Sequence, residues 1–236
     1  MAQPPGYEHS QFFDHVCRLH KAIYGLKQVP RPWYSRLYEK LVSFGFLNSK
    51  SDSSLFIYNE GGVRLFVLIY VDDIIITGSH ASSVESFICT LDDDFSLKDL
   101  GELNYFLGVE TTKVSDGLFL SQRRYIFNLL ERTKMSEAKP VSLPMSTSTS
   151  LSKFDSTTFD DPHLYRSTVG TLQYLSLTRP DISFTINKVC QFMHHPSISH
   201  WAVAKRILCY LKNTIDHGLL LRCGSTSQLS IYSDAD

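Results

Sequence analysis

The fold is decided by the segment Arg64-Leu-Phe-Val-Leu-Ile-Tyr70-Val71-Asp72-Asp73-Ile-Ile-Ile-Thr77-Gly78, in which an apolar run meets two adjacent carboxylates. Three isoleucines follow the acidic pair at once, so the pattern predicts two short buried strands that turn at Asp72 and Asp73. Two neighbouring ionised carboxylates repel each other, which makes a divalent cation their natural partner. A surface hairpin with Asp-Asp as turn residues accounts for the same pattern, and spacing alone leaves both interpretations open.

The composition is that of an ordinary globular protein. The chain has 236 residues, of which 43% are hydrophobic and 20% charged, enough for one large domain or two small ones. No apolar run approaches the ~20 residues of a membrane span, and the N-terminus has no signal-peptide pattern. Five scattered cysteines without tight pairs indicate a reducing compartment: Cys17, Cys89, Cys190, Cys209 and Cys223.

The net charge of −1 conceals a segregation along the chain. Residues 1–50 carry seven Lys and Arg against three Asp and Glu, whereas residues 51–120 carry three against twelve. Residues 121–236 are basic again, with thirteen against nine. An acidic centre between basic flanks suits a metal site served by phosphate-binding arms, although solvated surface charge is the favoured explanation of this pattern taken alone.

Periodicity predicts the elements around the acidic pair. A helix is expected from Pro32 to Gly45, and a hairpin is expected to turn at residues 59–62. Ser82 and Glu85 have the spacing of a capping box for a helix that reaches Phe95. The run Asp92-Asp93-Asp94 is interpreted as the solvated end of that helix rather than as a second metal site.

The second half of the chain predicts a strand at 105–110 after a loop, a turn at Asp116-Gly117 and a helix from Ser121 to Lys134. Residues 136–161 are rich in Ser, Thr and Pro, which is typical of a linker between subdomains. Three helices are expected beyond it, at 164–177, from Pro180 onward and at 200–212. Strands are expected at 218–222 and 228–233.

Short motifs stand in a fixed order along the whole chain: Tyr24-Gly25-Leu26-Lys27-Gln28, Pro30-Arg31 with Trp33, Tyr70-Val71-Asp72-Asp73, Lys98-Asp99-Leu100-Gly101, Tyr105-Phe106-Leu107-Gly108, Thr178-Arg179-Pro180-Asp181, Tyr210-Leu211-Lys212 and Tyr232-Ser233-Asp234. In this order they resemble the reverse transcriptase region of copia-type LTR retrotransposon Pol polyproteins. The resemblance covers essentially the entire sequence.

The resemblance implies an α+β fold. It would contain a reverse-transcriptase palm, an antiparallel sheet with helices on one face, followed by a helical thumb/connection and the first strands of an RNase H-like domain. The implied domains are a partial palm with the start of the thumb at 1–135, a linker at 136–161, the helical thumb/connection at 162–215 and a truncated RNase H start at 216–236.

The implied activity is that of an RNA-directed DNA polymerase, a nucleotidyltransferase that uses two metal ions. Asp72 and Asp73 would be catalytic metal ligands for two Mg²⁺, with Mn²⁺ as a substitute. The implied partners are an RNA template, a DNA primer, dNTPs and the remainder of the Pol polyprotein, without a membrane. The implied location is the cytoplasm, within a virus-like particle, or the nucleus.

The resemblance also assigns supporting residues. Template and nucleotide binding would involve Lys27, Gln28, Arg31, Tyr70, Val71 and Lys98. The primer grip would be Tyr105, Phe106, Leu107 and Gly108, and Asp234 would begin the RNase H site. Phosphate contacts are an option for Arg123, Arg124, Lys205, Arg206 and Lys212, for which plain surface charge is the simpler explanation.

The chain departs from the family pattern at its start. In the family, Gln3-Pro4-Pro5-Gly6 lies just downstream of the motif with the first catalytic aspartate, so Met1 is expected to fall after that residue. An isolated chain with two of three carboxylates is expected to be inactive. The alternative function is that of a non-catalytic retroelement remnant that binds nucleic acid or a protein partner. An unrelated two-metal phosphohydrolase would need further ligands near the pair, and none is recognisable.

Histidine and cysteine offer one competing site, formed by Cys190, His194, His195, His200 and Cys209. Their spacing does not match a standard zinc motif. Roles for these histidines in loops and helix caps are the favoured interpretation.

Overall fold

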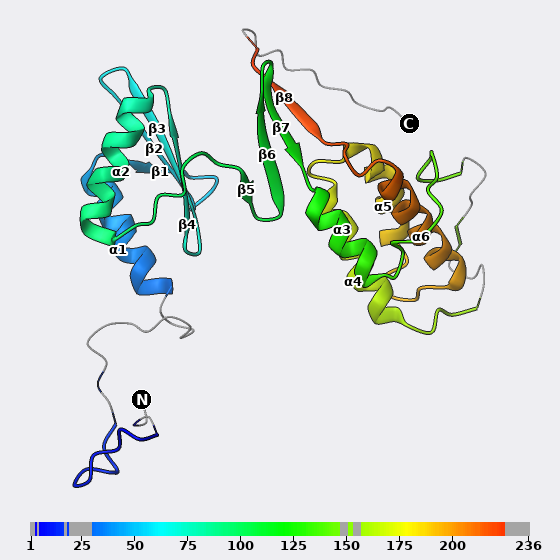
Figure 1. The fold of residues 1–236 in the computed structure, drawn as a ribbon, viewed down its shortest axis with the longest axis horizontal. Coiled ribbons are helices and arrows are strands. Elements are labelled where there is room, and N and C mark those ends of the chain that lie inside the picture. Colours follow the sequence, from blue (N-terminus) through cyan, green and yellow to red (C-terminus); the bar gives the residue numbers. More distant parts are fainter. Residues whose placement is uncertain are drawn as a thin grey trace. The chain divides into compact units, whose positions relative to one another are not determined.

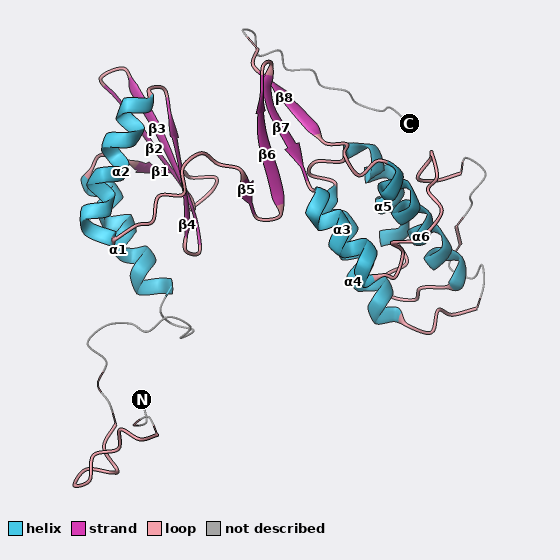
Figure 2. Cartoon of the chain, in the orientation of Figure 1, coloured by secondary structure: helices cyan, strands magenta, loops and turns pink. Residues whose placement is uncertain are grey.

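The structure is a computed structural model that describes residue 3, residues 5–16, residue 18 and residues 30–146, 151–152 and 157–224. Lys27, Gln28, Asp234 and the predicted strand 228–233 lie outside the described residues. The chain divides into two compact units, residues 1–101 and 102–236. Each unit contains a four-stranded antiparallel sheet together with helices (Figure 2), so the predicted α+β class is confirmed.

In its described residues, the first unit consists of one sheet and two helices. Its elements are α1 (Pro30–Ser43), β1 (Leu47–Asn48), β2 (Leu55–Glu60), β3 (Val63–Tyr70), β4 (Asp73–Gly78) and α2 (Ala81–Phe95). The strands pair in the order β1-β2-β3-β4, and α1 and α2 lie against the same face of the sheet (Figure 1). This is the expected arrangement of an antiparallel sheet with helices on one face.

Strand β3 shows why the segment that decides the fold forms this sheet. Leu65, Val67 and Ile69 are buried in a core that α1 and α2 complete. The alternate residues point to the opposite face, where Phe66 and Tyr70 are 37% and 49% exposed. The prediction of buried strands therefore holds for only one face of β3, because α1 and α2 pack on one side of an antiparallel hairpin sheet.

The glycine signal predicted the end of α1 correctly, whereas the capping signal did not predict the start of α2. Helix α1 ends before Gly45, whose φ of +89° is the left-handed conformation expected there. The predicted capping box of Ser82 and Glu85 was wrong, because α2 begins at Ala81 with His80 as its N-cap. The Ser79 amide still pairs with the sheet, donating to Arg64 O at 2.9 Å. Only His80 therefore separates the sheet pairing from the start of α2, which lies before the position that the sequence pattern indicates.

The second unit is a sheet interrupted by a helical bundle. Its elements are β5 (Tyr105–Phe106), β6 (Val109–Val114), β7 (Gly117–Ser121), α3 (Arg123–Arg132), α4 (Pro162–Leu175), η1 (Pro180–Ile182), α5 (Ser183–Cys190), α6 (Ile198–Asn213) and β8 (Leu219–Arg222). The strand order is β5-β6-β7-β8. Strand β8, within the segment expected to begin an RNase H-like domain, pairs with β7 of this sheet. The assignment of residues 216–236 to such a domain stays a prediction.

The helices of the second unit share one core, to which α3, α4, α5 and α6 contribute Ile126, Leu129, Val169, Leu172, Ile186, Ala204 and Leu208. The described residues of the predicted linker, 136–146, 151–152 and 157–161, contain no helix or strand, yet they pack on α6. Phe159 stacks on Trp201 with 5.0 Å between ring centroids, and the Val141 amide donates to Cys209 O. This segment is therefore a packed loop, and its assignment as a linker stays a prediction.

A buried polar network surrounds Arg179, whose side chain is 1% exposed. Its guanidinium donates to both carboxylate oxygens of Asp181 and to the carbonyl and hydroxyl oxygens of Thr214, the C-cap of α6. Thr178 donates to Gln122 Oε1 at 2.8 Å. The Thr-Arg-Pro-Asp motif thus joins η1, which leads into α5, to the end of α6 and to the N-cap of α3.

Candidate functional site

The acidic pair lies at the two-residue turn between β3 and β4. Tyr70 pairs with Asp73 across the hairpin, which leaves Val71 and Asp72 as the turn residues. Val71 has a φ of +53° and Asp72 does not have a positive φ, the pattern of a type II′ turn, whose first position normally requires glycine. A β-branched residue in this conformation is strained, so the surrounding hairpin must hold it there.

The hairpin presents both carboxylates to solvent from a rigid base. Asp72 and Asp73 are exposed, and Asp73 lies with Tyr70 on the sheet face opposite α1 and α2. Ile69 beneath the turn is buried, and its amide donates to Ser54 O at 3.0 Å. The two exposed residues are therefore carried on a backbone that the hairpin fixes.

Adjacent carboxylates suit Mg²⁺ or Mn²⁺, which prefer oxygen ligands. Asp72 and Asp73 could supply two such ligands from consecutive positions. Within the part of the chain that the structure describes, no group of three or more His, Cys, Asp or Glu side chains could hold a metal ion. The acidic pair is therefore a fitting but partial ligand set.

Two predicted nucleotide-binding residues are exposed in the same unit. Arg31 lies in the first turn of α1, and Lys98 lies in the loop that follows α2. In that loop Asp99 accepts a hydrogen bond from the Gly101 amide at 2.8 Å. Both cations are thus on the surface and free of the hydrophobic core, and their roles stay predictions.

The segment Tyr105 to Gly108 forms a hairpin in the second unit, whereas the sequence predicted a continuous strand. Leu107 and Gly108 have φ values of +49° and +83°, which makes them the two central residues of a tight turn between β5 and β6. Tyr105 and Leu107 are exposed at this turn. The periodicity failed here because Leu107, like Val71, takes a conformation that its residue type disfavours.

Strained backbone is concentrated at these two turns. Among the residues that the structure describes, the non-glycine residues with positive φ are Val71, Ser96, Leu107 and Lys134. Ser96 and Lys134 follow α2 and α3, where helix ends commonly adopt this conformation. The other two lie in the two segments that the sequence nominates as functional, which is where such strain often gathers.

Sequence reasoning missed the residues that support the second turn. Tyr174 of α4 donates a hydrogen bond from its hydroxyl to Leu107 O. Glu110 of β6 accepts from the Arg124 amide in the first turn of α3 at 3.1 Å. No local signal could have identified Tyr174, because it lies 67 positions from Leu107.

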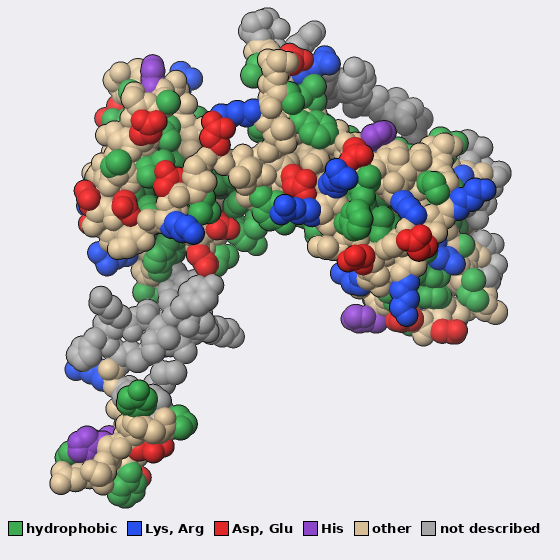
Figure 3. All heavy atoms as spheres, in the orientation of Figure 1, with side chains coloured by type: hydrophobic (Ala, Val, Ile, Leu, Met, Phe, Trp, Pro, Cys, Tyr) green, Lys and Arg blue, Asp and Glu red, His purple; other side chains and the backbone are tan. Residues whose placement is uncertain are grey.

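The basic residues named as phosphate contacts mostly have partners within the chain. Arg123 pairs with Asp216 at 3.2 Å, Arg124 lies 3.8 Å from a Glu110 oxygen, and Lys212 donates to Ala138 O. Figure 3 shows Lys and Arg side chains interspersed with Asp and Glu over α3–α6. Surface charge is the simpler role for these residues.

His200, one of the residues of the alternative metal site, caps a helix. His200 Nδ1 accepts from the Ser197 amide at 3.0 Å, and the Ser197 hydroxyl accepts from the His200 amide. The two residues form a capping box at the start of α6, and the histidine ring stacks on Phe192. His200 therefore has the cap role that the sequence favoured.

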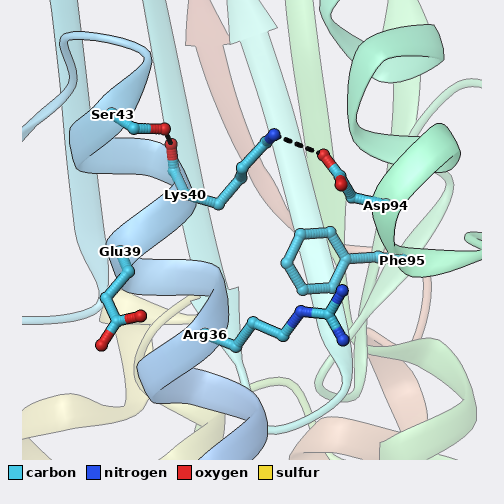
Figure 4. Close-up of a pocket in the computed structure, with 6 residues that line it drawn as sticks. All are labelled: Arg36, Glu39, Lys40, Ser43, Asp94 and Phe95. Carbon is cyan, nitrogen blue, oxygen red and sulfur yellow. Dashed lines mark hydrogen bonds and ion pairs between the residues drawn. The ribbon is translucent and has the colours of Figure 1, made fainter.

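A hollow of about 240 Å³ lies between α1 and α2 (Figure 4). Lys40 pairs with Asp94 across it at 2.6 Å, and the Arg36 guanidinium lies 5.4 Å from the centroid of the Phe95 ring. Asp94 is thus the partner of a lysine rather than part of a second acidic metal site. The contacts hold the two helices together, and none of the nominated functional residues lines the hollow.

Residues 1–147 match the family described as reverse transcriptase (RNA-dependent DNA polymerase). Over all its 236 residues the chain is 50% identical to the retrovirus-related Pol polyproteins from transposons RE2 and RE1 of Arabidopsis thaliana. It is 42% identical over 172 residues to an uncharacterized mitochondrial protein of the same plant, a match that covers 73% of this chain and 71% of that protein. No solved structure matches.

The chain therefore belongs to the reverse transcriptase family. Within that family its sequence is that of the reverse transcriptase region of copia-type retrotransposon Pol polyproteins, as its motifs indicated. It spans 16% of the length of the RE2 and RE1 polyproteins. None of the helices in the described ranges is long and apolar enough to cross a membrane.

Proposed function

We propose that this chain carries the metal-binding hairpin and the primer grip of an RNA-directed DNA polymerase, in which Asp72 and Asp73 are ligands of two Mg²⁺ ions. The observation that carries the proposal is the strained turn at Val71, which presents two adjacent exposed carboxylates from a buried hairpin base. Mn²⁺ would occupy the same oxygen ligands.

The geometry suits nucleotidyl transfer. The paired Tyr70 and Asp73 and the strained Val71 restrict where the two carboxylates can point, as in-line phosphoryl transfer requires. When bound, the ions would activate the primer 3′-hydroxyl and stabilise the leaving pyrophosphate. Tyr70 and Val71, which are 49% and 59% exposed, would lie beside the primer end.

The other assignments complete this proposal. The hairpin of Tyr105, Phe106, Leu107 and Gly108 would support the primer, while Arg31 and Lys98, with Lys27 and Gln28, would contact template and nucleotide. Asp234 would begin the RNase H site. The substrates would be an RNA template, a DNA primer and dNTPs, and the chain would act with the remainder of a Pol polyprotein, in a cytoplasmic virus-like particle or in the nucleus.

Metal binding tests the ligands directly. Mn²⁺ added to the 236-residue chain should broaden the NMR amide signals of residues 70–74 through its unpaired electrons. Asp72→Asn and Asp73→Asn should each raise the Mn²⁺ concentration needed for the same broadening at least tenfold, because each removes one anionic ligand. Asp99→Asn, another exposed acid, is the matched control. Equal broadening in all variants would refute the assignment.

Primer extension tests the activity. The described residues provide two carboxylates rather than three, so the chain should bind an RNA–DNA primer–template without extending it. Binding should weaken steeply with salt, because phosphate contacts release counterions. Robust Mg²⁺-dependent extension that Asp72→Asn abolishes would overturn the expected inactivity and would itself establish the acidic pair as catalytic.

A non-catalytic, nucleic-acid-binding remnant is the second candidate. It is favoured by the lack of a third carboxylate beside the pair among the described residues. Salt-dependent binding that is unchanged by Asp72→Asn, with no response of residues 70–74 to Mn²⁺, would support it over the polymerase assignment.

A further inference from the structure

The turn between β5 and β6 is held by two tyrosines of the helical bundle. Tyr174 on α4 donates its hydroxyl hydrogen to Leu107 O, and Tyr125 on α3 lies against Tyr174 with 5.3 Å between ring centroids. The two rings form an edge-to-face pair, which is a favourable aromatic geometry. The contact places a side-chain donor on the carbonyl of a strained, non-glycine turn residue.

Gly108 shows how closely the turn fits this pair of rings. A Cβ atom at position 108 would lie 3.4 Å from Tyr125 Cδ2 and 3.5 Å from Tyr174 Cε1. The φ of +83° at Gly108 independently disfavours any residue with a Cβ. Backbone and rings are therefore in contact over the tip of the hairpin.

The base of the same hairpin is attached to α3. Glu110 lies on β6, opposite Tyr105, and accepts a hydrogen bond from the Arg124 amide. Its carboxylate caps a helix whose own N-cap residue, Gln122, makes no side-chain cap. The hairpin is thus fixed to the bundle at both its tip and its base.

We infer that Tyr174 is a positioning residue for the primer 3′ end, acting through the Leu107 carbonyl on the turn that contacts the primer. This inference rests on the proposed primer-grip role of residues 105–108. Tyr174 would not touch the polynucleotide. It would fix the angle at which the exposed Tyr105 and Leu107 present themselves, and it would make that angle depend on the helical bundle.

The strain at Leu107 makes the hydroxyl necessary. A leucine in the left-handed region returns readily to ordinary backbone angles unless other contacts oppose this change. Tyr174→Phe removes the donor and keeps the ring against Gly108. Tyr125→Phe removes a hydroxyl from the other ring of the pair and keeps the bond to Leu107, so it is the matched control.

Hydrogen exchange of the free chain tests whether the Tyr174 hydroxyl holds the turn between β5 and β6. Tyr174→Phe should accelerate exchange of the amides of residues 105–110 roughly three- to tenfold, the usual effect of one lost hydrogen bond. Amides in α6 should not change, and Tyr125→Phe should leave the hairpin within about twofold of the unmodified chain. Unchanged hairpin exchange in Tyr174→Phe would overturn the inference.

A fluorescent primer tests whether Tyr174 positions the primer 3′ end. The chain is bound to an RNA template whose DNA primer ends in 2-aminopurine, a base whose emission reports its stacking. Tyr174→Phe should change this emission while the dissociation constant stays within about twofold, because the phosphate contacts remain. Gly108→Ala should change the emission in the same way by displacing the turn, and Tyr125→Phe should not.

The outcomes separate the two proposals. If Tyr174→Phe loosens the hairpin in hydrogen exchange but leaves the primer-end emission unchanged, the bond from Tyr174 to Leu107 is structural only and the positioning role is refuted. If no variant and not even the unmodified chain binds primer–template, the proposed function fails, and the positioning role fails with it. A change in emission with equal affinity supports both.

Discussion

Arg179 and Asp181, two positions apart in the chain, form a bidentate ion pair with N–O distances of 3.0 and 2.8 Å. The Arg179 side chain is 1% exposed and that of Asp181 38% exposed, so the carboxylate compensates a buried positive charge. Tyr210 adds a hydrogen bond to Asp181 at 2.8 Å and places its ring 5.6 Å from the guanidinium. The pair, with the bonds from Arg179 to Thr214, fixes the end of α6 to η1, which leads into α5.

Asp181→Ala should therefore destabilise the helical bundle by about 2 kcal/mol. Removing one partner leaves a buried guanidinium uncompensated, and partial exposure of the carboxylate keeps the loss below that of a fully buried pair. Urea unfolding followed by Trp201 fluorescence, in a Trp33→Phe background, measures the change. Asp216→Ala, which breaks only the exposed pair with Arg123, should change stability by less than about 0.5 kcal/mol. Equal losses in both variants would contradict a special role for the buried pair.

The same pair should make the bundle acid-sensitive. Burial alone would raise the pKa of Asp181, but hydrogen bonds from Arg179 and Tyr210 and the arginine charge outweigh it and hold this pKa below its ordinary value of 3.8. The folded state then binds fewer protons than the unfolded state in acid. This contribution to stability is complete above the unfolded pKa and is lost as the pH falls through the folded one. Urea midpoints between about pH 6 and about pH 3 should fall less steeply in Asp181→Asn than in the unmodified chain.

Val71→Gly should stabilise the first unit by about 0.5–1 kcal/mol. Glycine relieves the strain at a φ of +53°, and the exposed valine side chain contributes little burial. Exchange of the Ile69 amide, which bonds to Ser54 O, should slow accordingly. Val63→Gly, at the start of β3 with ordinary backbone angles, should destabilise the unit by about 1 kcal/mol. A loss of stability in both variants would mean that Val71 is not strained.

His200→Ala should destabilise the bundle by about 2 kcal/mol, because it removes the side-chain half of a buried capping box and the contact of Nε2 with Ser152 O. His200→Gln should recover about half of this loss, since an amide oxygen can accept from the Ser197 amide. Trp201 fluorescence during urea unfolding measures both. His195→Ala, on the exposed loop before α6, is the control, and a gain in stability on adding Zn²⁺ would contradict the cap role.

Elements with strong periodicity or glycine turns were predictable from sequence. The end of α1 at Gly45 and the β2–β3 turn at Gly61 and Gly62 follow from residues whose backbone preferences agree with the fold. The N-terminus of α2 was not predictable, because pairing of Ser79 with β3 decides where the chain leaves the sheet. Local preference gave way to tertiary pairing at this position.

The candidate site likewise has features that the sequence predicted and features that it did not. The family of the chain could be predicted from the acidic pair and its flanking motifs, and the match to the reverse transcriptase family confirms it. The ligand role of Asp72 and Asp73 stays a prediction. The conformations of Val71 and Leu107 could not be predicted from the sequence. Each residue type disfavours a positive φ, and only the antiparallel register imposes it. The contact of Tyr174 with Leu107 joins distant parts of the chain and needs the packed bundle.

Strand β8 pairs with β7 although the whole helical bundle lies between them in the chain. The contacts within the bundle span shorter stretches of chain than the pairing of Gly117 with Arg222, which must close a longer loop. We therefore expect β8 to join the sheet after the folding transition state. Substitutions in the β7–β8 ladder should then accelerate unfolding and leave the refolding rate nearly unchanged. The attachment of the bundle to its sheet would be a late event in the kinetics of this chain.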